Sequence, residues 1–144
     1  MTNPLVAVDL GGTWMRAAVV TASGERGEIA RRPTLRERSP ADIVEDLVDL
    51  IAQTRKEEII AGVAIGIPTT EDENCCLIAS DNLPTMSSFP LGSALESILK
   101  TRVRLFNDAN CFAFGEWQHG AGRGARNMCG VTLGTGLGVG LIIN

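Results

Sequence analysis

The chain has 144 residues, a length that suits one domain with a substantial core and is short for two. Hydrophobic residues make up 44% and charged residues 21%, which is the composition of a folded globular protein. The net charge of -4 and the aromatic content of 4% argue against a nucleic-acid partner, and the lack of any apolar run of about 18 residues argues against a membrane partner.

The N-terminal segment predicts three strands joined by turns. An apolar run at 5–10 ends in a glycine turn, and a second apolar run follows at 15–21. Ser23 and Gly24 form the next turn, which leads into a more polar third segment at 25–34. Strands separated by short glycine turns predict an antiparallel meander.

Helices and strands alternate after this meander. Ser39, Pro40 and the acidic Asp42 match the N-cap, the first position and the first turn of a helix. The apolar run 59–68, closed by glycine and proline, is typical of a strand buried on both faces. The chain then offers a polar loop at 74–82, a helix at 90–100, a strand at 103–106, a helix at 109–118, a glycine-rich connector at 120–124 and two β-like runs within 130–144. A meander followed by this alternation predicts an α/β fold with a mixed sheet.

The first glycine turn, Gly11-Gly12-Thr13, has the composition of a phosphate-binding loop. Glycine permits a positive φ and lets backbone N–H groups approach an anion without a Cβ in the way, and Thr13 adds a hydroxyl. Asp9, at the end of the first strand, could hold a hydrated magnesium ion, because magnesium keeps several waters and takes few carboxylates. A plain hairpin turn is the alternative, and this segment alone does not decide between them.

A second glycine segment, 133–140, has a spacing similar to G-x-G-x-x-G. The dinucleotide-binding motif needs a helix after the glycines, whereas a β-type run follows here. What remains is a second strand–loop–strand unit at Gly134, Thr135 and Gly136, chemically similar to the first. Two such loops suggest a nucleotide whose phosphates lie between two lobes.

Asp108 lies between Asn107 and Asn110, where a predicted strand gives way to a predicted helix. The helix N-terminus favours the ionised carboxylate. Phosphoryl transfer to a hydroxyl needs positioning, charge neutralisation and one acceptor for the hydroxyl proton, which an ionised Asp supplies. The two asparagines can hydrogen-bond a polyhydroxyl substrate. The alternative is that Asp108 only caps the helix; the two glycine loops favour the catalytic role.

Together these segments resemble the ROK family of sugar kinases and sugar-responsive repressors, with features of its glucokinases. The similar segments follow the family's order and spacing, and they are 6–20, 62–68, 82–84, 105–127 and 131–144. Two departures stand out. Trp14 takes a position where the family often has Lys or another polar residue, and the segment 65–74 lacks the usual Pro-Gly-Pro-like turn.

The resemblance implies an actin-like, ribonuclease-H-like fold of two lobes, with ATP and a hexose between them. It implies that Asp108 accepts the proton of a hexose hydroxyl, while Asn82 and Asn107 hold other hydroxyls. Phosphate contacts would come from Gly11, Gly12, Thr13, Gly134, Thr135 and Gly136. Residues 1–119 would form the first lobe, and residues 120–144 a connector and the first hairpin of the second. The adenine pocket, a Gly-Glu-x-Gly-His segment and a cysteine-rich zinc motif would lie in a part of the second lobe that is absent.

The expected function is therefore ATP- and Mg²⁺-dependent phosphorylation of a hexose, by a chain that is inactive alone and forms a homo-oligomer at full length. One alternative is a sugar-sensing repressor of the same family, which the eight residues before Asp9 disfavour because they leave no room for a winged helix. Another is a different actin-like ATPase, such as a chaperone, which would not need the asparagines around Asp108. The residues do not distinguish glucose, fructose, mannose and N-acetylated hexosamines.

The cysteines and the N-terminus bear on where the protein resides. No C-x-x-C pair is present, and the adjacent Cys75 and Cys76 are poorly placed to share one tetrahedral metal. The N-terminus has no basic flank and turns polar at Asp9, so it does not match a signal peptide. Reduced thiols and a cytoplasmic location are expected. His119, the single histidine, matches an exposed residue at a helix end.

Overall fold

The computed structural model describes residues 3–134 and 136–144. The chain divides into two compact units, Met1–Leu105 and Phe106–Asn144. The predicted boundary between lobes, at residues 119 and 120, concerns a fold larger than this chain and stays a prediction.

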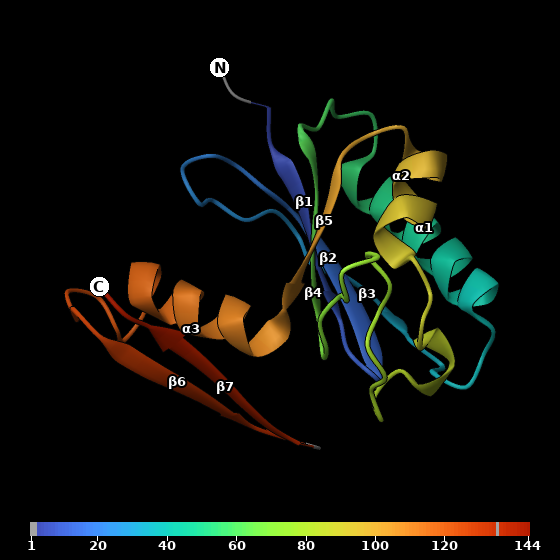
Figure 1. The fold of residues 1–144 in the computed structure, drawn as a ribbon. Coiled ribbons are helices and arrows are strands. Elements are labelled where there is room, and N and C mark those ends of the chain that lie inside the picture. Colours follow the sequence, from blue (N-terminus) through green and yellow to red (C-terminus); the bar gives the residue numbers. More distant parts are fainter. Residues whose placement is uncertain (1–2, 135) are drawn as a thin grey trace. The chain divides into compact units, whose positions relative to one another are not determined.

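The first unit is built on a five-stranded mixed sheet, the α/β architecture that the sequence predicts (Figure 1). Its strands lie in the order β3-β2-β1-β4-β5. The pairs β1–β2 and β2–β3 are antiparallel and form the predicted meander, while β1 and β4 are parallel. The strands are β1 (Leu5–Leu10), β2 (Trp14–Val20), β3 (Ala30–Pro33), β4 (Gly62–Ile67) and β5 (Val103–Asn107).

Two strands are shorter than the sequence predicts. β3 covers only Ala30–Pro33 of the predicted 25–34, because the start of that segment turns back on itself: the Glu25 N–H donates to the Thr21 hydroxyl at 3.1 Å. β4 begins at Gly62 and not at Ile59, whose side chain is 77% exposed and has no core to enter. The sequence therefore overestimates strand length at both places, by a turn-forming start in β3 and by an apolar but exposed start in β4.

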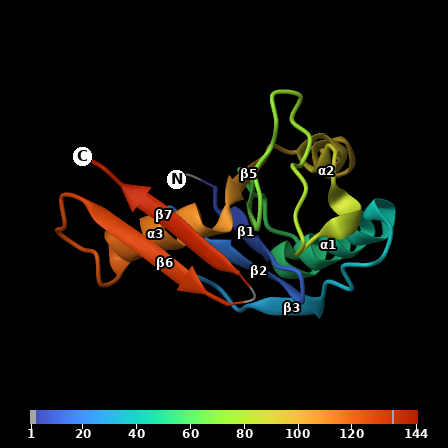
Figure 2. The same ribbon diagram turned by 60° about the horizontal axis from the view of Figure 1, so that its bottom comes forward.

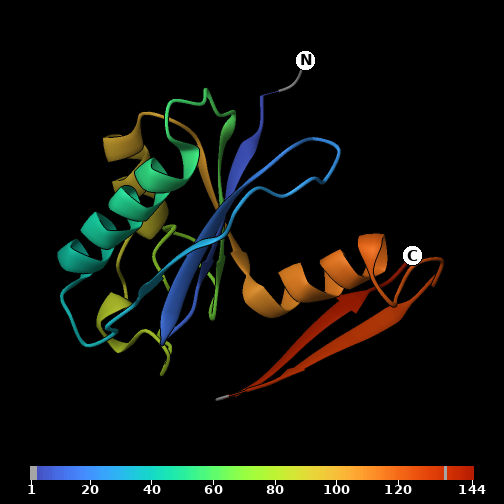
Figure 3. The same cartoon turned by 180° about the vertical axis from the view of Figure 1, so that it is seen from behind.

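Two helices cover one face of this sheet, as the views from front and back agree (Figures 1 and 3). α1 (Pro40–Arg55) begins as predicted: Ser39 is its N-cap, Pro40 is its first residue, and Ser39 and Asp42 form a reciprocal capping box. The hydrogen bond from Ser39 lowers the pKa of the Asp42 carboxyl. α2 (Leu91–Leu99) follows a short 3₁₀ helix, η1 (Pro84–Met86). The side chains between helices and sheet are almost wholly buried, and they include Leu10, Met15, Leu47, Ile51, Ile65, Ile67, Leu83, Met86, Leu91 and Leu95.

The second unit consists of one helix packed on one hairpin (Figure 2). α3 (Asp108–His119) lies against the antiparallel strands β6 (Met128–Leu133) and β7 (Leu137–Ile142). Ala109 and Ala113, one helical turn apart, are the buried residues of α3.

Glycines on the hairpin make this close approach of α3 possible. A Cβ at Gly130 would lie 2.9 Å from the Ala113 Cβ, and one at Gly140 would lie 2.5 Å from the Ala109 carbonyl oxygen. Gly138 meets the Ala109 Cβ at 2.9 Å in the same way. The glycines at 138 and 140 therefore lie within β7 and serve its packing against α3.

Gly140→Ala should destabilise the protein by about 1–3 kcal/mol, the usual cost of forcing extra atoms into a packed contact. The added methyl group would meet the backbone of α3, which cannot move aside as a flexible side chain can. Denaturant unfolding monitored on α3 measures the change. Gly115→Ala is the control: nothing lies within 4 Å of its Cβ, so better helix propensity should stabilise the protein by about 0.5–1 kcal/mol. Equal effects of the two substitutions would contradict the packing.

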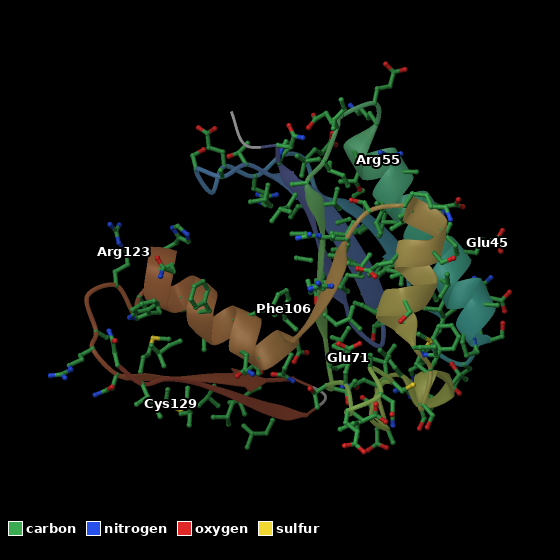
Figure 4. The ribbon with its side chains drawn as sticks, turned by 45° about the horizontal axis from the view of Figure 1, so that its top comes forward. Glu45, Arg55, Glu71, Phe106, Arg123 and Cys129 are labelled. Atoms are coloured by element: carbon green, nitrogen blue, oxygen red, sulfur yellow. The ribbon has the colours of Figure 1, made fainter. Side chains whose placement is uncertain are left out.

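The hairpin presents apolar side chains on its other side, away from α3 (Figure 4). Val131, Leu133 and Leu137 are 49%, 84% and 69% exposed, and Val139 and Leu141 are also exposed. No charged residue occurs after Arg126. An uncharged hairpin with an apolar face is prone to pair with other chains.

Among the described residues, none of the helices has the length and apolar character that a membrane span requires.

Candidate functional site

The first glycine loop joins β1 to β2 and is held tightly at both glycines. The Gly11 N–H donates to the Trp14 carbonyl at 3.0 Å, and a Cβ at Gly11 would lie 3.1 Å from that same oxygen. A Cβ at Gly12 would lie 2.6 Å from the Asn82 carbonyl oxygen. Neither glycine has a positive φ, so the loop does not use the conformational freedom that glycine permits. Close approach of neighbouring backbone, and not chain reversal, requires glycine at both positions.

Asn82, predicted to hold a hexose hydroxyl, therefore lies directly against the phosphate-loop candidate. Its own N–H donates to the Ser80 hydroxyl at 3.3 Å. The residues that follow it anchor the segment, because Leu83 and Met86 are 1% exposed in the core. Burial raises the pKa of the Glu71 carboxyl, in the loop that leads from β4 toward Asn82 (Figure 4).

Gly12→Ala should disturb both loops at once, because its methyl group would collide with the Asn82 backbone. We expect a loss of about 1–3 kcal/mol in the free energy of unfolding, together with weaker binding of any ligand of the Gly11–Thr13 backbone. Chemical denaturation and ligand titration measure the two effects. Gly27→Ala is the matched control, since its Cβ would meet Val19 at an ordinary 3.6 Å. A Gly12→Ala protein as stable as that control would refute the close contact.

Thr34 joins this site although no sequence motif marks it. It is the one polar residue among the buried side chains of the described chain, at 0% exposure. Its hydroxyl donates to the Gly11 carbonyl at 2.6 Å, and its N–H donates to the Thr13 carbonyl at 3.0 Å. Thr34 is the last residue of the predicted segment 25–34, and nothing in the sequence there indicates this contact.

Asp9, the magnesium candidate, forms an ion pair with Arg16. The Asp9 Oδ2 and the Arg16 Nη1 lie 2.8 Å apart, and both side chains are about half exposed, at 53% and 50%. The two residues are register partners across β1 and β2, a pairing that symmetry about the predicted three-residue turn would have missed by one residue. The described residues contain no group of three or more His, Cys, Asp or Glu that could hold a metal ion. Asp9 thus fits magnesium only as one carboxylate acting through water.

Trp14, the departure noted in the sequence, lies beside this pair. The guanidinium carbon of Arg31 lies 5.2 Å from the centre of the Trp14 ring, within cation–π range. Arg31 is also the register partner of Arg16. The Arg31 guanidinium therefore packs on the indole of Trp14, the residue that follows Thr13.

In the second unit, Asn107 and Asp108 have different roles at the start of α3. The Asn107 Oδ1 accepts from the Asn110 N–H at 3.1 Å, so Asn107 is the N-cap. Asp108 is the first helical residue; its Oδ1 accepts from the Ala109 N–H at 2.7 Å, and the residue is exposed. Asn107 is therefore the N-cap, and Asp108 also accepts a hydrogen bond from a first-turn N–H group of the same helix.

The second glycine loop is open where the first is closed. Gly134 and Gly136 lie at the β6–β7 turn, where the Gly134 N–H donates to the Gly136 carbonyl at 3.0 Å. Apart from chain neighbours, no atom of the described residues lies within 4 Å of a Cβ built at either position. Thr135, the third predicted residue, lies outside the described residues. The backbone here has room for a ligand beside it.

A family model described as the ROK family matches residues 5–144. Among curated proteins, a glucokinase of Thermotoga maritima is 36% identical over 139 residues, which make up 96% of this chain and 44% of that protein. An N-acetyl-D-glucosamine kinase of Vibrio vulnificus is 33% identical over 135 residues, 93% of this chain and 44% of that protein.

A solved structure shows the same fold. The ROK family glucokinase from Streptomyces griseus, in complex with glucose and AMPPNP, superposes with a TM-score of 0.86 at 30% identity. The match covers 97% of this chain and 44% of that one. The fold is thus that of the actin-like sugar kinases, as the sequence predicts, and the chain spans less than half the length of these relatives.

Proposed function

Because the chain belongs to the ROK family, we propose that it is the N-terminal portion of a kinase that transfers a phosphoryl group from ATP to a hexose hydroxyl. Relatives named as glucokinases and as an N-acetylglucosamine kinase support a hexose or an N-acetylated hexose as the acceptor. Since less than half of their length is represented here, activity belongs to a protein that also has the second lobe.

Phosphate binding is assigned to the two glycine loops. The backbone N–H groups of Gly12 and Thr13, with the Thr13 hydroxyl, would donate hydrogen bonds to the nucleotide, while Gly11, whose N–H donates to the Trp14 carbonyl, would shape the loop beside it. The open backbone at Gly134 and Gly136, with Thr135 between them, would do the same from the second unit. Asp9 would hold magnesium through water. Magnesium, when bound with the nucleotide, offsets the negative charge of the phosphoryl oxygens.

Asp108 is the proposed general base, and its exposure at the first turn of α3 is the observation that carries the proposal. With the cap supplied by its neighbour, the Asp108 carboxylate lies exposed at the N-terminus of α3, where the helix dipole favours its charged form. It can accept the hydroxyl proton as the oxygen attacks phosphorus. Asn82 and Asn107 would hold neighbouring hydroxyls.

A nuclear magnetic resonance titration of this chain tests the binding roles directly. Mg·ATP should shift the amide signals of residues 11–13 and 134–136, and glucose or N-acetylglucosamine should shift those of Asn82 and Asn107. Galactose at equal concentration serves as a control for non-specific effects. Unchanged signals at 11–13 with millimolar Mg·ATP would overturn the phosphate assignment.

The alternative of a sugar-sensing repressor belongs to the same family, so a gel-shift assay with DNA must separate the two. The family match argues against the other alternative, a different kind of actin-like ATPase such as a chaperone. A homo-oligomer at full length and a cytoplasmic location remain predictions.

A further inference from the structure

The segment between β3 and α1, Thr34–Arg38, contacts both parts of the first unit's candidate site. We name it the β3–α1 linker. Through Thr34 it reaches the glycine loop, and through Arg36 it reaches the segment that carries Asn82. These contacts join stretches of chain that are far apart in sequence, so no local motif contains them.

Thr34 fixes the direction of a peptide group in the glycine loop. Its buried hydroxyl donates to the Gly11 carbonyl at 2.6 Å. In a trans peptide the C=O and the following N–H point in opposite directions, so this bond turns the Gly12 N–H away from Thr34. No described residue accepts a hydrogen bond from the Gly12 N–H. The Thr34 hydroxyl thus orients a donor that has no protein partner within the described chain.

Arg36 holds the other side through two reciprocal bonds. Its guanidinium donates to the Asp81 carbonyl at 3.0 Å, and its own carbonyl accepts from the Thr85 hydroxyl at 3.2 Å. These two bonds bracket Asn82, whose backbone lies against Gly12. The position of the Asn82 segment relative to the glycine loop is therefore set from both sides by one linker.

We propose that Thr34 and Arg36 are positioning residues that hold the nucleotide-phosphate loop and the hexose-binding Asn82 at a fixed separation. The proposal rests on the function proposed above for those two loops. Neither residue touches substrate: Thr34 acts through the Gly11–Gly12 peptide, and Arg36 acts through the backbone of Asp81 and Thr85.

Hydrogen exchange of the chain without ligand tests the linker itself. Thr34→Val keeps the shape of the side chain but removes the donor, so exchange at the Gly11 and Leu83 amides should accelerate about tenfold. Thr34→Ser should restore slow exchange, because the hydroxyl returns. Core amides such as that of Ile65 should keep their rates; acceleration of all amides to the same extent would show a merely structural role and overturn the proposal.

Arg36→Met provides a second variant, because the Arg36 side chain is exposed and its replacement leaves the core intact. It keeps the aliphatic stem and should accelerate exchange at Leu83 and Met86, whose amides bond within the Asn82 segment. Arg26→Met is the matched control, since that guanidinium donates to the neighbouring Gly27 carbonyl, far in sequence from both loops, and its loss should leave them unchanged. Unchanged exchange in Arg36→Met would remove Arg36 from the proposal.

Exchange with Mg·ATP and glucose then separates this proposal from the proposed function. In the unmodified chain the ligands should slow exchange at the Gly12 amide, Thr34→Ser should keep that slowing, and Thr34→Val should lose it. If the ligands slow exchange at no amide of the unmodified chain, the proposed function is wrong. The exchange rates measured without ligand still test the positioning role of the linker in that case. If Thr34→Val keeps full slowing at Gly12, the positioning role of Thr34 is wrong.

Discussion

Asp108→Asn should lower kcat of the complete kinase by about 10²–10⁴-fold, the usual contribution of general-base assistance. An Asn side chain keeps the shape and still hydrogen-bonds a hydroxyl, but its amide oxygen is too weak a base to take the proton. Hexose affinity should fall by only about 1–2 kcal/mol, because a charge-assisted hydrogen bond becomes a neutral one. Steady-state kinetics and hexose-binding calorimetry on the same variant measure both quantities.

Asp42→Asn is the control for this substitution. Asp42 is also an acidic residue in the first turn of a helix, where it completes the capping box of Ser39. Its replacement should cost some stability and leave kcat unchanged. If Asp108→Asn behaves in the same way, with near-normal kcat, Asp108 is a structural residue and not the base.

The chain alone should show no hexose-dependent turnover of ATP above the background rate. Kinases of this kind close two lobes over their substrates, which excludes water and completes the site. Here the second unit contributes one helix and one hairpin, and the relatives are more than twice as long. A coupled assay of ADP release, with and without hexose, measures the rate.

Addition of the missing lobe, fused to the chain or supplied as a separate polypeptide, should restore turnover in that assay. The Asp108→Asn chain combined with the same lobe is the control, because it should assemble but stay slow. Robust hexose-dependent release of ADP by the unmodified chain alone would show that one lobe suffices, contrary to this expectation.

The sequence predicts best those elements whose causes are local. The start of α1 is correct because Ser39, Pro40 and Asp42 provide the capping interactions among themselves. The hairpin of β1 and β2 is correct because two apolar runs flank a short glycine turn. β3 is overestimated because its first half has turn-forming side chains whose hydrogen bonds compete with the strand.

The residues of the candidate site show the same difference between local causes and contacts with distant parts of the chain. The sequence proposes Asp9, Asn107 and Asp108 because polar residue types stand at element ends, and their roles stay predictions. Thr34 and Arg36 were not, since an ordinary threonine and an exposed arginine become notable only through contacts with distant chain. The sequence also does not predict the tight packing at Gly11 and Gly12, because the approach of the Trp14 and Asn82 backbones depends on tertiary structure.

Because α3, β6 and β7 follow one another along the chain, we expect this unit to form before the first unit during refolding. All contacts within this unit join neighbouring stretches of chain, whereas the first unit must pair Leu5 with Gly62 before its parallel strands form. Loop closure costs more entropy and time over such separations, while a hairpin forms in about 1–10 μs. The apolar hairpin face therefore exists early, beside a first unit that is still unfolded. Molecules that meet at that stage would aggregate through this apolar face. The yield of native protein on refolding should therefore depend on protein concentration more than on the free energy of unfolding of the native state.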